Sequence, residues 1–304
     1  MTGGLIECVP NFSEGRNAHI VEAIAAAIRG VAGVALLDTS LDADHNRSVI
    51  TFAGEPEAVA EAALRGVAEA ARLIDLTRHC GVHPRIGATD VVPFIPLGTT
   101  ALADCVTIAR SVGMRIWTEL GVPVYFYEAA ALRPGRRNLA ELRRGQFEGL
   151  SREGLASPAR RPDFGGDRPH PTAGVTAVGA RKFLIAYNIN LATREVEIAR
   201  QIARKIRQSS GGFQHVKAMG VLLESQGLAQ VSMNLTDFEE TPVDAVYESV
   251  EREAARRGVR VASSEVVGLV PKKAFEMAPE FYRRAANFRP DVVLETRLAE
   301  IQSK

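Results

Sequence analysis

Cysteine is scarce in this sequence, and the few cysteines form no recognisable pattern. The chain of 304 residues contains only Cys8, Cys80 and Cys105, an odd and unevenly spaced set. Small secreted domains that depend on disulfides carry an even number of closely spaced cysteines. The sequence therefore predicts a protein that does not rely on a disulfide framework.

An excess of charge of either sign is also missing. The 37 lysines and arginines nearly balance the 36 aspartates and glutamates, which leaves a net charge of +1. Proteins that bind nucleic acids or membrane surfaces without specificity carry a clear positive excess. We therefore expect neither kind of partner, although this balance is compatible with a local basic groove for an acidic small molecule.

Long apolar runs and several well-known motifs are absent as well. No apolar run approaches the roughly 20 residues that cross a bilayer, and residues 1–7 lack the basic and apolar parts of a signal peptide. The sequence contains neither GxGxxG after a strand, nor GxxxxGKS/T, nor GxSxG. We therefore expect a soluble, cytoplasmic protein. We expect it to be neither a dinucleotide-binding protein, nor a Walker-type nucleotide-binding protein, nor an α/β-hydrolase.

The first half of the chain has turn signals and hydrophobic patterns that predict the order β-α-β-β-α-β. Asn17 is suited to cap one helix, and Pro56 suits the first turn of a second helix that ends near Thr77. The strands are expected at residues 5–10, 34–38, 48–53 and 91–97. Pro93 and Pro96 predict that the last of these strands is short, irregular or at a sheet edge.

The second half of the chain repeats this order. The expected helices and strands are residues 194–208 and 242–257, and residues 183–190, 216–223, 228–235 and 259–263, respectively. Two halves with one order favour an α+β fold of two ferredoxin-like subdomains, each an antiparallel sheet with its helices on one face. We expect the subdomains at residues 1–181 and 182–304, and a single mixed α/β domain is the alternative.

A less regular segment joins the two halves. A helix is expected at residues 100–120 and a strand at residues 122–127, whereas residues 155–174 are rich in proline, glycine, arginine and aspartate and have no regular period. A long irregular segment inside a compact protein is usually functional or disordered. We expect the groove between the two halves to be the ligand site.

His83 is the strongest candidate for an acid/base group. Gly81 and Gly87 bracket it, and Pro84 favours an extended backbone at His83. A histidine presented on a rigid loop at the start of a strand suits proton transfer near neutral pH. A surface histidine with a single hydrogen bond is the alternative, and spacing alone does not decide between the two.

The same loop offers a weak metal pattern and one cysteine. His79, Cys80 and His83 give His-Cys-x-x-His, but no second Cys/His cluster completes four zinc ligands. Nothing in the sequence identifies a group that would orient a histidine base beside Cys80. We therefore expect neither a metal site nor cysteine chemistry here.

Residues 42–47 (Asp-Ala-Asp-His-Asn-Arg) concentrate polar groups between two expected strands. The plain interpretation is a polar hairpin loop stabilised by Asx turns. The functional interpretation is a substrate clamp, in which Arg47 binds a carboxylate while Asp42 and Asp44 face a cation. The glycine and glutamate that complete an EF-hand loop are missing, so calcium binding is not expected.

Several separated segments, taken together and in order, resemble one family. They are residues 7–15 (Glu-Cys-Val-Pro-Asn-Phe-Ser-Glu-Gly), 46–49 (Asn-Arg-Ser-Val), 83–88 (His-Pro-Arg-Ile-Gly-Ala), 93–96 (Pro-Phe-Ile-Pro), 121–125 (Gly-Val-Pro-Val-Tyr), 162–165 (Pro-Asp-Phe-Gly) and 179–186 (Gly-Ala-Arg-Lys-Phe-Leu-Ile-Ala). From about Leu5 to its end, the sequence resembles the formiminotransferase family of histidine breakdown.

This resemblance implies an enzyme, a one-carbon group transferase of histidine degradation. The implied reaction moves the formimidoyl group from N-formimidoyl-L-glutamate to N5 of tetrahydrofolate, a co-substrate, without a metal. The resemblance also implies a homodimer whose chains each hold folate in a groove between two ferredoxin-like subdomains. The vertebrate cyclodeaminase domain is not part of this sequence, so a separate cyclodeaminase is an expected partner.

Two other functions are compatible with the same residues. One is the same folate site acting on 5-formyltetrahydrofolate, and the other is a folate-binding protein without catalysis. The intact segment around His83 favours catalysis, because a protein that only binds folate needs no acid/base group there.

The resemblance also assigns residues. It makes His83 the catalytic acid/base, and it places folate binding at Gly165, Gly166, Asp167, Arg168, Pro169, His170, Pro171, Thr172, Ala173 and Gly174. That stretch lacks the aromatic residue of the vertebrate version, and Ser40 stands where some members carry an aspartate close to the active site.

The expected reaction needs charged partners for both substrates. A carboxylate would stabilise the cationic amidine of the donor and orient the imidazole of His83. Arginine or lysine would bind the glutamate carboxylates of the donor and of folate. The candidates for these roles are Asp42, Asp44, Asn46, Arg47, Arg85, Asp90, Arg181 and Lys182.

Overall fold

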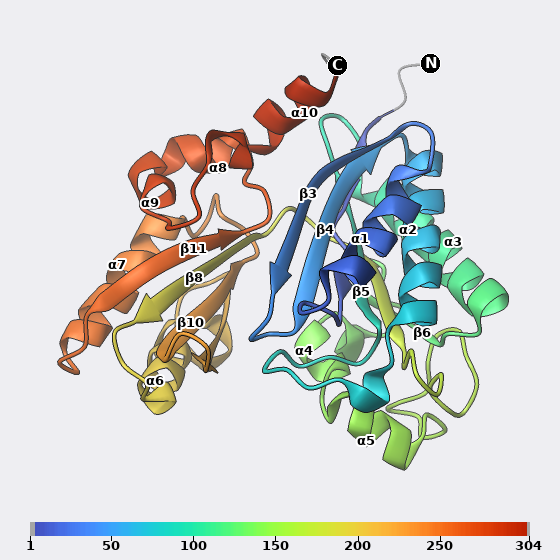
Figure 1. Ribbon diagram of the computed structural model, residues 1–304, viewed down its shortest axis with the longest axis horizontal. Helices are drawn as coiled ribbons and strands as arrows, with labels where there is room; N and C mark the ends of the chain where they lie inside the picture. The colour runs from blue at the N-terminus through green and yellow to red at the C-terminus, as the bar shows by residue number, and fades with distance from the viewer. Residues whose placement is uncertain (1–3, 303–304) are drawn as a thin grey trace. The chain divides into compact units, whose positions relative to one another are not determined.

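The computed structural model describes residues 4–302 of the chain. The chain divides into two compact units, the first ending at Arg181 and the second beginning at Lys182, and Figure 1 shows both. Each unit has its own sheet and its own cluster of buried apolar side chains. Residues 1–3 and 303–304, at the ends of the ranges expected from the sequence, lie outside the described part. The groove expected between the halves stays a prediction.

The first unit begins with the predicted order of helices and strands. Its elements are β1 (Ile6–Cys8), β2 (Asn11–Phe12), α1 (Ala18–Arg29), β3 (Val34–Asp42), β4 (Arg47–Gly54), α2 (Pro56–Leu73), η1 (Leu76–Arg78), β5 (Thr89–Pro96), α3 (Leu102–Leu120), β6 (Val124–Glu128), η2 (Pro134–Arg136), α4 (Leu139–Leu142), α5 (Gln146–Glu153) and β7 (Thr176–Ala180). The Asn17 side chain caps α1, as predicted, by accepting a hydrogen bond from the His19 N–H. Pro56 begins α2, which ends earlier than expected because the short 3₁₀ turn η1 takes over.

The sheet of the first unit has seven strands and is mixed, so the expectation of four antiparallel strands was wrong here. Its order is β3-β4-β1/β2-β5-β7-β6, in which β1 and β2 together fill one position. β7 pairs in parallel with both β5 and β6. The parallel pairing arises because α3 carries the chain back along the sheet between β5 and β6. The short strand β7 escaped prediction because it contains Gly179 and follows the irregular segment.

Strand β5 lies inside the sheet, so the edge position offered as one alternative was wrong, whereas the irregularity offered as another is present in its shifted pairing with β2. It has eight residues and pairs with β1 and β2 on one side and with β7 on the other. Pro93 lies opposite the interruption between β1 and β2, where its carbonyl accepts a hydrogen bond from the Val9 N–H. The N–H that proline lacks would point into this interruption, so the proline costs the sheet no ladder hydrogen bond.

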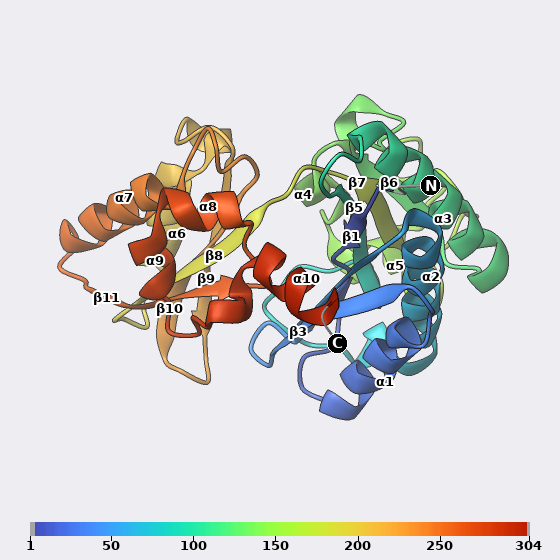
Figure 2. The same ribbon diagram turned by 90° about the horizontal axis from the view of Figure 1, so that it is seen from above.

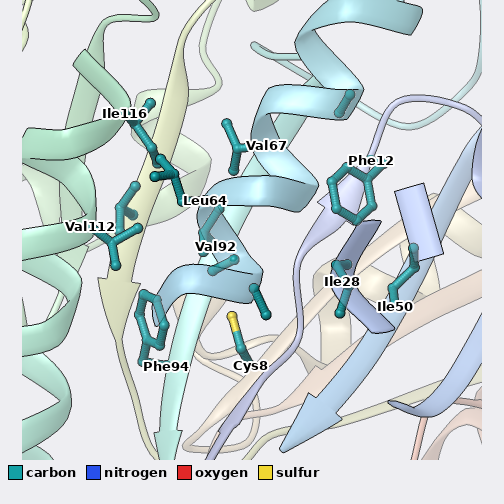
Figure 3. Close-up of a cluster of buried hydrophobic side chains, with 14 of the residues drawn as sticks. Cys8, Phe12, Ile28, Ile50, Leu64, Val67, Val92, Phe94, Val112 and Ile116 are labelled. Atoms are coloured by element: carbon teal, nitrogen blue, oxygen red, sulfur yellow. The ribbon is translucent and has the colours of Figure 1, made fainter. Parts of the chain in front are cut away.

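Helices α1, α2 and α3 cover one face of this sheet, as Figures 1 and 3 show. Their side chains, including Ile28 and Ile116, pack with Phe12 and Phe126 of the strands in one buried cluster. Tyr125 points to the opposite face, because successive side chains of a strand alternate, and there a smaller cluster joins α5 to β5, β6 and β7. The expectation that every helix lies on one face was therefore wrong for this unit.

The second unit follows the predicted order closely and then continues. Its elements are β8 (Ile185–Leu191), α6 (Val196–Ile206), η3 (Gln208–Ser210), β9 (Val216–Leu223), β10 (Leu228–Leu235), α7 (Val243–Ala255), β11 (Val261–Val267), α8 (Lys272–Met277), α9 (Pro279–Arg283), η4 (Pro290–Val292) and α10 (Leu294–Gln302). The strands form an antiparallel sheet in the order β11-β8-β10-β9. Helices α6 and α7 contribute to one apolar cluster with its strands.

Helices α8, α9 and α10, visible in Figure 2, were not predicted. The first two are short, and Ala278 and Pro279 separate them, so no sustained helical period marks this part of the sequence. Across residues 4–302, no helix has both the length and the apolar character that a membrane crossing requires.

Candidate active site

The loop that carries His83 lies on the turn between β3 and β4. The loop runs from η1 to β5 without helical structure, and the Val82 N–H donates to the Asp44 carbonyl at 3.3 Å. Gly81 makes this close approach possible, because a Cβ atom there would clash with the His45 carbonyl oxygen. The His83 loop and the turn between β3 and β4, which are far apart in the sequence, are thus in contact, and His83 is partly exposed there.

Asn46 fastens three segments together at this point. Its backbone adopts the left-handed conformation, with φ of 48°, which asparagine tolerates better than most residues. Its side-chain oxygen accepts from the Gly15 N–H at 3.0 Å, and its side-chain nitrogen donates to the Cys80 carbonyl at 3.0 Å. These contacts give Asn46 a structural task, and its predicted part in a substrate clamp stays a prediction.

Arg47 contacts the ring of His83 directly. Its Nη1 lies 3.1 Å from His83 Nε2 and 3.3 Å from Asn11 Oδ1. A guanidinium group only donates hydrogen bonds, so Nε2 must accept, and the ring is neutral with its proton on Nδ1. Burial first, then the positive charges of Arg47 and Arg143, and after them the neighbouring His45 and His79 hold the pKa of His83 well below its ordinary value. At neutral pH His83 is therefore a proton acceptor.

Asp42 and His45 form a hydrogen-bonded pair beside His83. Asp42 Oδ2 lies 2.7 Å from His45 Nδ1, and Asp42 Oδ1 accepts from the His45 N–H at 2.8 Å. Burial raises the pKa of Asp42, but the His45 hydrogen bonds outweigh it and hold that pKa below its ordinary value. The ring centroids of His45 and His83 are 6.3 Å apart. Sequence reasoning did not single out His45, although its three-residue separation from Asp42 within a turn was a usable signal.

Arg85 is already held by a carboxylate. Its guanidinium donates to Glu148 Oε1 and Oε2, at 2.6 and 2.8 Å, in the two-point geometry that arginine prefers. It also donates from Nε to His79 Nδ1 at 3.0 Å. His79 Nε2 in turn donates to the Asn46 carbonyl at 2.9 Å, and burial lowers the pKa of His79. In this structure Arg85 therefore supports the His83 loop, and its role as a substrate clamp stays a prediction.

Asp90 is committed in a similar way. Its side chain is buried, and its Oδ1 accepts from the Ile86 N–H at 2.9 Å. Its Oδ2 accepts from Nε and Nη2 of Arg143, the former at 2.9 Å. Asp90 thus joins the start of β5 to both the His83 loop and the segment after α4. Its predicted contact with the amidine also stays a prediction.

The stretch at residues 165–174 runs to the same loop. The Ala88 N–H donates to the Ala173 carbonyl at 2.9 Å, and the Val175 N–H donates to the Ile86 carbonyl at 3.0 Å. Gly87 and Gly174 form an isolated bridge between these contacts. The His170 ring accepts from the Ala173 N–H at 3.0 Å, which folds the stretch back on itself. Two segments that sequence analysis singled out separately therefore lie side by side.

Arg181 and Lys182 lie elsewhere. The Arg181 N–H donates to the Phe94 carbonyl near the end of β5, whereas the His83 loop precedes the start of that strand. Burial raises the pKa of Tyr127 to about 12, against the lowering effect of the nearby Arg181 charge. Lys182 pairs with Asp237 of the second unit at 3.1 Å. The contacts described above do not involve His83, and the predicted substrate roles of Arg181 and Lys182 stay predictions.

The metal pattern of the loop does not assemble into a site. Within residues 4–302, no three His, Cys, Asp or Glu side chains gather in a geometry that would hold a metal ion. Cys80 is exposed, and its carbonyl serves as an acceptor for Asn46. The chemistry that these residues support is proton transfer by a neutral imidazole beside a cluster of arginines.

The two units match two parts of one family description. Residues 5–181 match the N-terminal subdomain of the formiminotransferase domain, and residues 186–298 match the formiminotransferase domain that follows it. A chain whose two α+β units match these two subdomains in order belongs to the class of proteins built from this pair of subdomains. The chain belongs to the formiminotransferase family, as its sequence motifs predicted.

Full-length relatives agree with this assignment. The chain is 48% identical over 284 residues to the glutamate formimidoyltransferase of Streptococcus pyogenes serotype M1, covering 93% of this chain and 95% of that protein. It is 45% identical over 296 residues to the glutamate formimidoyltransferase of Thermoplasma acidophilum, covering 97% of each. It is also 48% identical to the formimidoyltransferase-cyclodeaminase of Gallus gallus, of which it covers 52%.

Proposed function

We propose that this protein transfers the formimidoyl group of N-formimidoyl-L-glutamate to N5 of tetrahydrofolate. The proposal is supported by similarity along nearly the whole chain to two proteins named glutamate formimidoyltransferase. The observation that carries it is the neutral ring of His83, held on a loop that also contacts residues 172–175. A neutral imidazole beside a candidate folate stretch is the arrangement that proton removal from N5 needs.

The proposed reaction exchanges one carbon–nitrogen bond for another. N5 of tetrahydrofolate attacks the amidine carbon of the donor, which forms a tetrahedral intermediate. The bond from that carbon to the glutamate nitrogen then breaks, and glutamate leaves. His83 accepts the proton from N5 and returns it to the glutamate nitrogen, so the products are 5-formimidoyltetrahydrofolate and L-glutamate. The protein also holds the two substrates together, which removes much of the entropic cost of their meeting.

The finer architecture belongs to the same proposal. We infer that each unit contains a ferredoxin-like core. In both β11-β8-β10-β9 and β5-β1/β2-β4-β3, the strands lie side by side in the order fourth, first, third and second along the chain, which is the order of a ferredoxin-like sheet. In the first unit β7 and β6 extend this core. Tetrahydrofolate is the proposed co-substrate, with residues 165–174 as its binding stretch, and a homodimer and a separate cyclodeaminase are proposed as partners.

Turnover of N-formimidoyl-L-glutamate with tetrahydrofolate tests the function. We expect turnover by the wild type and a fall in kcat of roughly 10²–10⁴ in the His83→Ala variant, the usual contribution of an acid/base group. His19→Ala, on the exposed side of α1, is a matched control that should keep full activity. An unchanged rate in the His83→Ala variant would falsify the role of His83.

Two further arms of this assay separate the neighbouring functions. Turnover of 5-formyltetrahydrofolate, with none of the formimidoyl donor, would replace the proposed reaction by a one-carbon salvage reaction. Binding of tetrahydrofolate without turnover of either donor would identify a protein that only binds folate.

A further inference from the structure

The turn between β3 and β4 holds a second histidine, His45, whose hydrogen-bonding polarity is fixed. Both carboxylate oxygens of Asp42 accept from it, Oδ1 from the backbone N–H at 2.8 Å and Oδ2 from ring Nδ1 at 2.7 Å. An ionised carboxylate only accepts hydrogen bonds, so Nδ1 carries the proton of the uncharged ring. The opposite ring nitrogen, Nε2, is therefore a hydrogen-bond acceptor.

This acceptor is available to a ligand. The His45 side chain is only 5% exposed, and within residues 4–302 its Nε2 makes no hydrogen bond. Nε2 is nevertheless not among the unpaired polar atoms of this part of the chain that are cut off from solvent. Polar atoms in buried side chains usually find a partner. An accepting nitrogen that solvent still reaches, on an otherwise buried ring, is suited to bind an N–H group of a small molecule.

His45 also lies where the proposed reaction takes place. The ring centroids of His45 and His83 are 6.3 Å apart, and the two rings are tilted by 58°. This separation is about twice the length of one hydrogen bond. A small group that is bound at one ring is therefore within reach of the other.

The group that the proposed reaction transfers is a hydrogen-bond donor. A formimidoyl group ends in a nitrogen that carries hydrogen, and this nitrogen is cationic when the amidine is protonated. A formyl group has nearly the same size but ends in a carbonyl oxygen, which only accepts. The lone pair of His45 Nε2 pairs with the first group and opposes the lone pairs of the second. The negative charge of Asp42 behind the ring favours the cationic group further.

We propose that His45, oriented by Asp42, selects the formimidoyl group over the formyl group, because its Nε2 accepts a hydrogen bond from the terminal nitrogen of the formimidoyl group. This inference rests on the proposed function, because that function supplies the formimidoyl donor. It gives Asp42 its predicted task toward the cationic amidine, but the task is performed through the ring of His45 and not by direct contact.

Two donors that differ at one position test the selection. N-formimidoyl-L-glutamate and N-formyl-L-glutamate are each offered with tetrahydrofolate at pH 8, where an ordinary histidine ring is uncharged. The two donors differ in intrinsic reactivity. The diagnostic quantity is therefore the change that a variant causes in the ratio of kcat/KM for the formimidoyl donor to kcat/KM for the formyl donor. Loss of a merely structural contact would lower both values alike and leave this ratio in place.

Asp42→Asn is the sharpest variant, because it should reverse the polarity of His45. The amide oxygen can still accept from the His45 backbone N–H, which places the amide NH₂ against Nδ1. Nδ1 must then accept, so the ring proton moves to Nε2, and the acceptor becomes a donor. We expect the ratio to fall by about 10–100-fold, the usual effect of one opposed hydrogen bond.

His45→Gln and Arg16→Gln complete the set. The glutamine amide can turn to accept or to donate, so His45→Gln should lower the ratio less than Asp42→Asn does. Arg16 is exposed and donates to the Ala43 carbonyl of the same turn at 2.9 Å. Arg16→Gln therefore removes a contact of the turn without touching His45, and its ratio should equal that of the wild type.

The outcomes that overturn the selection differ from those that overturn the function. A ratio that stays unchanged in both Asp42→Asn and His45→Gln would show that the pair only supports the turn. If these variants do not fold, calorimetry on the wild type decides, because N-formyl-L-glutamate should bind at least about tenfold more weakly than N-formimidoyl-L-glutamate. Equal binding, with formimidoyl transfer intact, would retain the function and remove the selection. Absence of formimidoyl transfer by the wild type would remove the function itself.

Discussion

The histidine at the centre of this site is neutral chiefly because it is buried, and the positive charges of Arg47 and Arg143 add to this effect. Burial and four basic side chains lower the pKa of His83, so the ring stays uncharged until the pH falls well below the ordinary value for histidine. No substrate is needed for this state, because Arg47, Arg143, His45 and His79 are all supplied by the fold.

Asp42 offers a test of electrostatics at the residue scale. Its pKa is lowered in the folded chain, so its stabilising effect is present above the unfolded value and is lost as the pH falls through the folded value. We expect Asp42→Asn to reduce the free energy of unfolding by about 1 kcal/mol at pH 7, a figure kept low because the carboxylate is partly exposed. Urea unfolding at several pH values measures it, with replacement of the exposed Asp167 by asparagine as the control.

That difference in unfolding free energy should shrink toward zero as the pH falls below the ordinary aspartate pKa of 3.8 and on through the lower value of the folded chain. A difference that stays constant across this range would mean that Asp42 acts through its shape and backbone contacts and not through its charge.

Sequence reasoning reaches some of these residues and misses others for a physical reason. Glycine and proline next to His83 are local signals, so the loop that presents the histidine could be predicted. The contact of Arg47 with His83 spans 36 positions, and that of Arg85 with Glu148 spans 63. Neither contact produces a local sequence pattern. The sequence therefore does not distinguish an arginine that binds a carboxylate of the protein from one that binds a neutral side chain.

At the scale of elements, the site depends on two segments joined through their main chains. The Ala88–Ala173 and Ile86–Val175 hydrogen bonds fix the end of the 165–174 stretch beside the His83 loop. Gly174 lies between them with φ of 69°, and a Cβ atom there would clash with the Ile86 carbonyl. A side chain at this position would separate the candidate folate stretch from the loop that holds His83.

Gly174→Ala tests this junction. We expect the free energy of unfolding to fall by about 2–3 kcal/mol, from backbone strain and the steric clash together, and the KM for tetrahydrofolate to rise. Gly98→Ala is the matched control, because Gly98 also has a positive φ, of 57°, but has open space around it. Its loss of stability should be limited to about 1 kcal/mol of strain. Equal losses in the two variants would contradict the importance of the junction.

The strands themselves could be predicted where two strands that follow one another in the sequence also pair in the sheet. β9 and β10 have the predicted bounds, because a short turn joins them and their apolar residues alternate. β5 and β7 pair across more than eighty positions, and the interruption that makes Pro93 tolerable belongs to another part of the chain. Central placement of a proline-containing strand therefore could not be predicted from the strand alone.

At the scale of the molecule, each unit has the apolar core of an independent domain. The second unit packs α6 and α7 with its strands in one cluster, to which Ala274 and Tyr282 of its later helices also contribute. A fragment of residues 182–304 is within the size range of single domains. We expect this fragment to fold alone and to unfold in one cooperative transition, which thermal circular dichroism measures.

A fragment that lacks a cooperative transition would show that the core of the second unit needs the first. The full-length chain is the control, and a matching near-ultraviolet signal from the buried tyrosines would establish that the isolated fragment keeps its native packing.

The main-chain attachment of the candidate folate stretch has a consequence for protein engineering. Hydrogen bonds from backbone groups hold residues 172–175, whereas the side chains of Asp167 and Arg168 are exposed. Replacing those two side chains leaves the anchoring bonds intact, so a combinatorial library at these two positions would vary the candidate binding surface without disturbing the anchored backbone. Every variant would keep the His83 loop unchanged, so this stretch is the place to begin directed evolution if it binds folate as proposed.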